Sequence, residues 1–286
     1  MPEEARVRER TFTSSDNLQL FFRDWGEEND EAVPVLCIPG LTRNSNDFLG
    51  LARHLASHRR VICPDLRGRG RSARAADWRT YEPGAYLDDI RHLLAALGLG
   101  RVIVIGTSMG GLLGTAMAAA YPTALAGLII NDVGPDVGNE GAGRILAYIS
   151  QDRPVKDWAA AVNHLRETFP SLSFAGDEDW LAFAQGTYRE GADRALHFNW
   201  DVRLARPLLE PAEPHPDLWN LWRAIRAVPT LAIRGGVSDI LSAETFQHMK
   251  AEKPDLAQVT IPGVGHCPTL AEPAARKAID EFLAQF

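Results

Sequence analysis

The sequence has few cysteines, and this scarcity excludes two classes of site. Three cysteines, Cys37, Cys63 and Cys267, occur in 286 residues, without a C-x-x-C pair. An odd number of widely separated cysteines does not suit a disulfide framework or a structural zinc site, and it is typical of a reducing compartment. We therefore expect neither kind of site.

The chain also lacks a basic excess and a long apolar run. It has 30 Lys and Arg against 37 Asp and Glu, a net charge of −7. That balance argues against nucleic acid or an anionic membrane as the main partner. No segment approaches the roughly 18 consecutive apolar residues of a membrane span, and "MPEEARVRER" lacks the apolar region of a signal peptide. We expect a cytoplasmic globular protein, whose oligomeric state the sequence does not indicate.

Short apolar runs alternate with helical patterns along most of the chain. After a predicted hairpin ("RVRERTFTSS" and "LQLFFRDWG"), the apolar runs are "VPVLCIPG", "RRVICPDLRG", "RVIVIGTS", "LAGLIINDVGP", "VPTLAIRGG" and "AQVTIPG". Amphipathic segments such as "YLDDIRHLLAALGL" lie between them. The alternation predicts an α/β protein with a mostly parallel, doubly wound sheet covered on both faces.

One region interrupts this alternation. Residues 135–227 show no convincing buried strand, and they hold five of the seven tryptophans. A segment of this length is too long for a plain loop. We expect it to form a helical cap inserted between late strands of a core made by residues 1–134 and 228–286.

The segment "GTSMG", Gly106 to Gly110, matches G-x-S-x-G between a predicted strand and a predicted helix. Glycines on both sides of Ser108 allow a sharp turn in which side chains would collide with neighbouring segments. The helix that follows directs its positive end at the same place. The motif predicts that Ser108 is a nucleophile, and a purely structural turn is the alternative.

A serine nucleophile needs a histidine base that a carboxylate orients. His266 lies in a Gly-rich loop after a late predicted strand, "AQVTIPGVGHCP". Two acids fit the order Ser, acid, His: Asp239 in "LAIRGGVSDILS" and Asp132 in "LIINDVGP". We favour Asp239, because Gly235-Gly236 and Ile240-Leu241 are typical of a loop that aims a carboxylate inward. Asp132 is the alternative acid.

Taken together, these motifs resemble the α/β-hydrolase fold superfamily, in particular its esterase, lactonase and C–C hydrolase branch. "IPGLTRNSNDF" is similar to the oxyanion loop, "PDLRGRGRS" to the D-x-R-G-x-G-x-S turn and "GTSMGG" to the nucleophile elbow, while "RGGVSD" and "GVGHCP" resemble the acid and histidine loops. The resemblance implies a fold with a helical cap and a Ser108–His266–Asp239 triad. It also implies oxyanion donors at the backbone N–H groups of Leu41 and Met109, and no metal or organic cofactor. The chain departs from the family at Pro39-Gly40, where His-Gly is usual.

The expected activity is hydrolysis of small to medium apolar carboxylic esters or lactones through an acyl-enzyme. Two alternatives stay open: a C–C bond hydrolase acting on ring-fission products, and a non-catalytic ligand receptor on the same fold. Haloalkane dehalogenases and epoxide hydrolases use an aspartate where this chain has Ser108.

Overall fold

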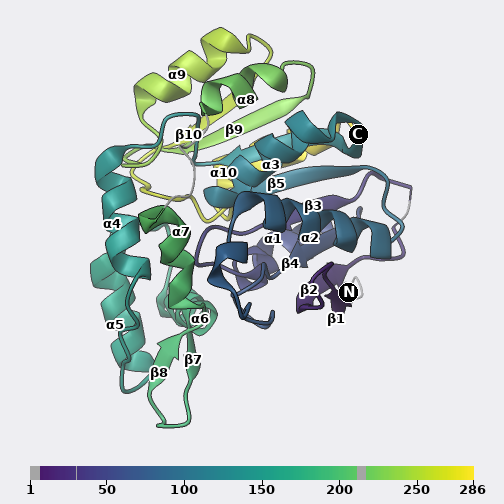
Figure 1. The fold of residues 1–286 in the computed structure, drawn as a ribbon. Coiled ribbons are helices and arrows are strands. Elements are labelled where there is room, and N and C mark those ends of the chain that lie inside the picture. Colours follow the sequence, from purple (N-terminus) through teal and green to yellow (C-terminus); the bar gives the residue numbers. More distant parts are fainter. Residues whose placement is uncertain (1–6, 30, 211–216) are drawn as a thin grey trace.

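The computed structural model describes residues 7–29, 31–210 and 217–286, and its central feature is an eight-stranded sheet (Figure 1). The strand order is β1-β2-β4-β3-β5-β6-β9-β10. The strands are β1 Val7–Thr13, β2 Gln19–Trp25, β3 Val35–Ile38, β4 Val61–Pro64, β5 Val102–Thr107, β6 Leu125–Asn131, β9 Thr230–Gly235 and β10 Ala257–Ile261. Neighbours from β4 to β10 are parallel, whereas β1 and β2 form an antiparallel hairpin. The predicted hairpin and mostly parallel sheet are confirmed.

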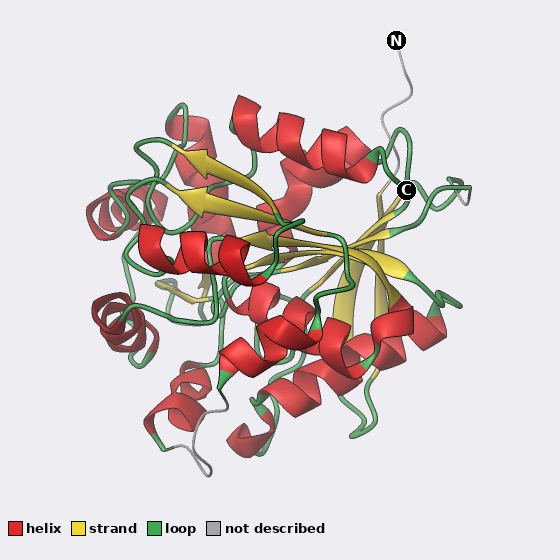
Figure 2. Ribbon diagram, turned by 90° about the horizontal axis from the view of Figure 1, so that it is seen from above, coloured by secondary structure: helices red, strands yellow, loops and turns green. Residues whose placement is uncertain are grey.

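Helices cover both faces of this sheet (Figure 2). They are α1 Leu49–Leu55, α2 Pro83–Ala96, α3 Met109–Ala120, α9 Ala243–Glu252 and α10 Pro273–Leu283. Successive residues of a strand point to opposite faces, so Val104 packs in the cluster with α2, α3 and α9, and Ile105 packs in the cluster with α1 and α10. Burial on both faces explains why the strands are continuous apolar runs.

The segment between β6 and β9, which we call the insertion, contains five helices and a hairpin among its described residues. They are α4 Asn139–Ile149, α5 Trp158–Thr168, α6 Asp177–Thr187, β7 Tyr188–Glu190, β8 Leu196–Phe198, α7 Arg206–Leu209 and α8 Leu218–Ala224. All but α8 lie together beside the sheet in Figure 1. The β7–β8 hairpin differs from the expected all-helical segment, because three-residue strands are too short to show an alternating pattern.

Aromatic side chains form a small core inside the insertion. Trp200 is buried and stacks on Phe198, with ring centroids 4.0 Å apart. Tyr148 of α4 contacts both rings. Within the described ranges, every helix is too short or too polar to span a bilayer.

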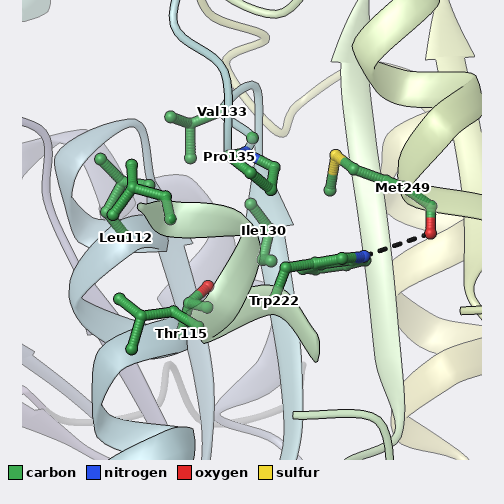
Figure 3. A pocket seen from close by; sticks show the side chains of 10 residues that line it. Leu112, Thr115, Ile130, Val133, Pro135, Trp222 and Met249 are labelled. Carbon is green, nitrogen blue, oxygen red and sulfur yellow. Dashed lines mark hydrogen bonds between the residues drawn. The ribbon is translucent and has the colours of Figure 1, made fainter. Parts of the chain in front are cut away.

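The last helix of the insertion, α8, packs against the core. Its buried Trp222 donates from Nε1 to the carbonyl oxygen of Met249 in α9, 3.3 Å away, and faces Ile130 of β6 (Figure 3). A cavity of about 20 Å³ remains between α8, β6 and α3. The predicted cap, residues 135–227, includes α8, and α8 packs against α3 of the core.

Candidate active site

Ser108 occupies a sharp turn between β5 and α3. Its backbone has φ 52° and ψ −120°, a strained conformation for a residue with a side chain. A Cβ atom on Gly106 would lie 2.2 Å from the carbonyl oxygen of Gly110, and one on Gly110 would lie 2.1 Å from that of Ile38. Both glycines are therefore required by close approach of the backbone, and the turn holds the serine at the carboxyl end of β5.

Three side chains form a hydrogen-bonded chain at this edge of the sheet. Ser108 Oγ lies 2.9 Å from His266 Nε2, and His266 Nδ1 lies 2.8 Å from Asp132 Oδ2. With a proton on Nδ1, the imidazole donates to the carboxylate, and Nε2 is free to accept the serine proton. The structure thus brings Ser108 and His266 together and places the carboxylate of Asp132 on the other side of the imidazole.

The carboxylate of Asp132 is fully buried directly after β6, which pairs with β5, the strand that precedes Ser108. Its Oδ1 accepts a hydrogen bond from the backbone N–H of Gly235 at 2.7 Å, and its Oδ2 accepts one from Ser238 Oγ at 2.7 Å. Both donors belong to β9 or the loop after it. This loop therefore supplies hydrogen-bond donors to the carboxylate that contacts His266.

The predicted contact between Asp239 and the imidazole is wrong. Asp239 is 43% exposed and forms a two-pronged ion pair with Arg144 of α4, with N···O distances of 2.9 and 3.0 Å. Gly235 does not serve to aim the carboxylate of Asp239 inward. A Cβ atom placed on Gly235 would lie 2.5 Å from the carbonyl oxygen of Gly265. The glycine thus lets the β9 loop approach the histidine loop, and the alternative acid, Asp132, makes the contact.

A cavity of about 110 Å³ lies in front of Ser108. The insertion and the oxyanion loop supply most of its wall, and its apolar lining residues include Leu41, Ile145, Tyr148, Ile149, Phe169, Leu172 and Phe183. Burial raises the pKa of Tyr148 and of the Cys267 thiol, so both are neutral at pH 7. The aromatic residues in this wall are a tyrosine and two phenylalanines. The helical spacing of Ile145, Tyr148 and Ile149 was the available signal.

Two backbone N–H groups beside this cavity have no protein acceptor within the described part of the chain. They belong to Leu41, in the loop after β3, and to Met109, the first residue of α3. The first N–H groups of a helix have no partner within that helix, and the helix dipole makes this end attractive to negative charge. A carbonyl oxygen near Ser108 can accept hydrogen bonds from donors of this kind.

Comparison with known proteins identifies the family. A family model described as alpha/beta hydrolase fold matches residues 33–153. A 3-hydroxybutyrate-oligomer hydrolase from Cupriavidus necator is 34% identical over 275 residues, which cover 92% of each chain. The crystal structure of an alpha/beta hydrolase from Novosphingobium aromaticivorans has a TM-score of 0.92 at 42% identity, covering 99% of this chain and 100% of that one. The chain belongs to the α/β-hydrolase fold family, which confirms the resemblance read from its motifs.

A more distant relative has another named substrate. The 2-(acetamidomethylene)succinate hydrolase of Mesorhizobium japonicum is 26% identical over 258 residues, with 87% of each chain covered. Both curated relatives are hydrolases by name, and their substrates differ. Family membership therefore does not by itself select the bond that this chain cleaves.

Proposed function

We propose that this protein is a serine hydrolase that cleaves small to medium apolar carboxylic esters or lactones through an acyl-enzyme. The observation that supports this most directly is the chain of contacts from Ser108 Oγ through His266 to Asp132. A serine hydroxyl is a weak nucleophile until an adjacent base takes its proton. The buried carboxylate of Asp132 would hold that base in the required tautomer and stabilise the imidazolium that forms.

The proposed reaction has two halves. His266 takes the proton from Ser108 as the serine oxygen bonds to the acyl carbon, and the N–H groups of Leu41 and Met109 stabilise the oxyanion. The bond to the leaving alkoxide breaks as His266 returns the proton to it, leaving an acyl-serine. Water then attacks the acyl carbon with His266 as base, which releases the acid and regenerates the hydroxyl.

The lining of the cavity supports an apolar substrate. In the described part of the chain, its two arginines are both paired with carboxylates, Arg43 with Asp47 and Arg144 with Asp239. The rest of the wall is largely aliphatic and aromatic, which is typical of small-molecule sites. The relative from Cupriavidus necator acts, by its name, on 3-hydroxybutyrate oligomers. Oligomers of a hydroxy acid are joined by ester bonds, so that substrate falls in the proposed class.

The insertion would act as the cap over this site. Residues Arg144, Ile145, Tyr148 and Ile149 of α4 reach the cavity that Ser108 also lines. A substrate bound there would lie between the insertion and the carboxyl ends of the strands. Residues of the insertion would then determine substrate specificity, while Ser108, His266 and Asp132 of the core would catalyse the reaction.

Active-site labelling and a substrate panel test the proposal together. A fluorophosphonate probe should add one phosphonyl group per chain, at Ser108, and Ser108→Ala should remove both the label and the turnover while the protein stays folded. The panel contains p-nitrophenyl acetate and butyrate, a 3-hydroxybutyrate dimer, γ-butyrolactone and a ring-fission dienoate.

Each outcome of that experiment points to one function. Labelling with turnover of esters or lactones supports the proposal. Turnover of the dienoate alone identifies a C–C bond hydrolase. A folded protein that neither labels nor turns over any compound, yet binds one tightly, is the non-catalytic receptor.

A further inference from the structure

Arg69 is a fully buried cation without a carboxylate partner. Its side chain belongs to the "PDLRGRGRS" turn and is 1% exposed. Across residues 7–29, 31–210 and 217–286, no Asp or Glu oxygen lies within 4 Å of its guanidinium, whereas the equally buried Arg67 pairs with Asp16 and Asp89. Burying a charge is costly unless a partner offsets it. The position of Arg69 therefore calls for an explanation.

The guanidinium of Arg69 donates to neutral acceptors, and one of them lies in the loop that carries a proposed oxyanion donor. Its Nε donates to the carbonyl oxygen of Leu41. Its Nη1 donates to the carbonyl oxygen of Arg67 at 2.7 Å, and its Nη2 donates to Tyr86 Oη at 3.1 Å. The guanidinium carbon also lies 4.8 Å from the centre of the Tyr86 ring, within cation–π range. These contacts fix the direction of the side chain.

Arg69 also approaches the side chain of Met109, the residue that carries the other proposed donor. Arg69 Nη2 lies 3.8 Å from the sulfur of Met109, the residue that follows Ser108. One guanidinium thus contacts Leu41, in the loop after β3, and Met109, the first residue of α3. Because the guanidinium is buried, water screens its charge only weakly.

The backbone of Arg69 is fixed from the side of the insertion. Arg69 forms an isolated antiparallel bridge with Trp200. On its two sides, Gly70 N–H donates to the carbonyl oxygen of Asn199 at 2.9 Å, and Asp201 N–H donates to that of Gly68 at 2.8 Å. The arginine is therefore anchored to the insertion at its backbone and to the oxyanion loop at its side chain.

We propose that Arg69 is a positioning residue for the oxyanion hole, an inference that rests on the proposed serine hydrolase function. It holds Leu41 by its carbonyl oxygen, so that the N–H of Leu41 faces the acyl oxygen. Its uncompensated positive charge favours the state in which that oxygen becomes negative. Interactions that strengthen only in the transition state raise kcat and leave substrate binding unchanged.

The test compares four variants at three positions, Arg69, Arg67 and Tyr86. Arg69→Gln removes the charge and most donors, and Arg69→Lys keeps the charge. Arg67→Lys is the matched control, because it changes a side chain of equal burial, two residues away, that does not contact Leu41 or Met109. Tyr86→Phe removes one acceptor of Arg69 and gives a milder variant if the arginine variants do not fold. Each variant is assayed for kcat and KM on the best ester of the panel and for inhibition by phenylboronic acid, which forms a tetrahedral adduct with an active serine.

We expect Arg69→Gln to lower kcat by about 10- to 100-fold with KM within about twofold, as for a small misplacement of catalytic groups. The inhibition constant of the boronic acid should rise in proportion, because the adduct mimics the transition state. Arg69→Lys should recover part of kcat, and Tyr86→Phe should lose a few-fold. Arg67→Lys should lower the melting temperature while kcat and boronate inhibition stay within about twofold of wild type.

Two results would overturn the inference. One is a folded Arg69→Gln, or a folded Tyr86→Phe if the former does not fold, with wild-type kcat and boronate inhibition. The other is an equal loss of kcat in Arg67→Lys, which would make the effect one of general stability. If wild-type protein is neither labelled by the fluorophosphonate nor active on the panel, the proposed function fails first. Failure of the Arg69 inference alone leaves wild-type labelling and turnover intact.

Discussion

Replacing each of the two candidate acids by asparagine separates the contact seen in the structure from the one expected from sequence. Asp132 accepts three hydrogen bonds while fully buried: from Gly235 N–H to Oδ1, and from Ser238 Oγ and the His266 imidazole to Oδ2. An asparagine of the same shape can present an oxygen at only one of these two positions. In Asp132→Asn, the amide nitrogen of the asparagine therefore faces one of the groups that donate to the carboxylate in the wild type.

The two orientations of that asparagine have different consequences. If its amide nitrogen takes the Oδ2 position, the imidazole must accept at Nδ1 and carry its proton on Nε2, where it cannot receive the proton of Ser108. If the nitrogen takes the Oδ1 position, the buried N–H of Gly235 loses its acceptor, at a cost of about 1–3 kcal/mol. In the first orientation Ser238 Oγ also loses its acceptor, but a hydroxyl can accept from the amide nitrogen, whereas a backbone N–H can only donate. The first orientation is therefore favoured, and with the wrong tautomer we expect kcat to fall by about 10⁴-fold.

Asp239→Asn is the matched control. Its ion pair with Arg144 has side chains 43% and 40% exposed, and exposed pairs contribute about 0–1 kcal/mol. We expect kcat within about threefold of wild type and a melting temperature within a few degrees. Initial rates with p-nitrophenyl butyrate and the rate of fluorophosphonate labelling measure the effect, and circular dichroism verifies the fold. A large loss in Asp239→Asn together with an active Asp132→Asn would refute the reasoning, since it would show that the contact between Asp132 and His266 is not the functional one.

Two further predictions follow from local geometry and charge. Gly110→Ala should lower the free energy of unfolding, measured by denaturant titration, by about 3 kcal/mol, because the new Cβ atom would meet the backbone of Ile38. Gly143→Ala is the control: nothing lies within 4 Å of its new atom, so the same titration should find it neutral or stabilising. Hydrogen bonds to the carboxylates of Asp152 and Asp193 raise the pKa of His197 above its usual value of 6.5. These contacts therefore stabilise the insertion fully below pH 6.5, and their contribution is lost as pH rises through the folded pKa. Hydrogen exchange of the β7–β8 amides should therefore be faster, relative to the intrinsic rate, at about pH 8 than at about pH 6, and His197→Gln should remove that difference.

The sheet and the elbow were predictable because their signals are local. Strands buried on both faces need continuous apolar runs, and the elbow needs glycine at Gly106 and Gly110 because the backbone packs against itself there. Such requirements act through residues close in sequence or directly on the backbone. They are therefore visible in a single sequence, as is the position of His266 after the last strand.

The choice of acid was not predictable in this way. Asp239 and Asp132 both follow strands that end at the same edge, so their spacing to the serine does not separate them. What separates them is the path of the loop after β9, which the close approach of Gly235 to Gly265 brings against the histidine loop. That path places Ser238 as a donor to Asp132 and leaves Asp239 facing the insertion. It depends on packing between segments far apart in the chain.

The different contacts of the two arginines in the "PDLRGRGRS" turn were likewise not predictable from the sequence. Arg67 and Arg69 are two residues apart, equally buried and chemically identical. Gly68 between them has φ 78°, a left-handed conformation that turns the chain, and the two side chains reach different neighbours. Arg67 reaches carboxylates and stabilises the turn, whereas Arg69 reaches the loop beside Ser108. The two arginines share residue type and burial and differ in their partners. A difference in kcat between variants of Arg67 and Arg69 would therefore report on the partners of each guanidinium and not on the loss of a buried cation.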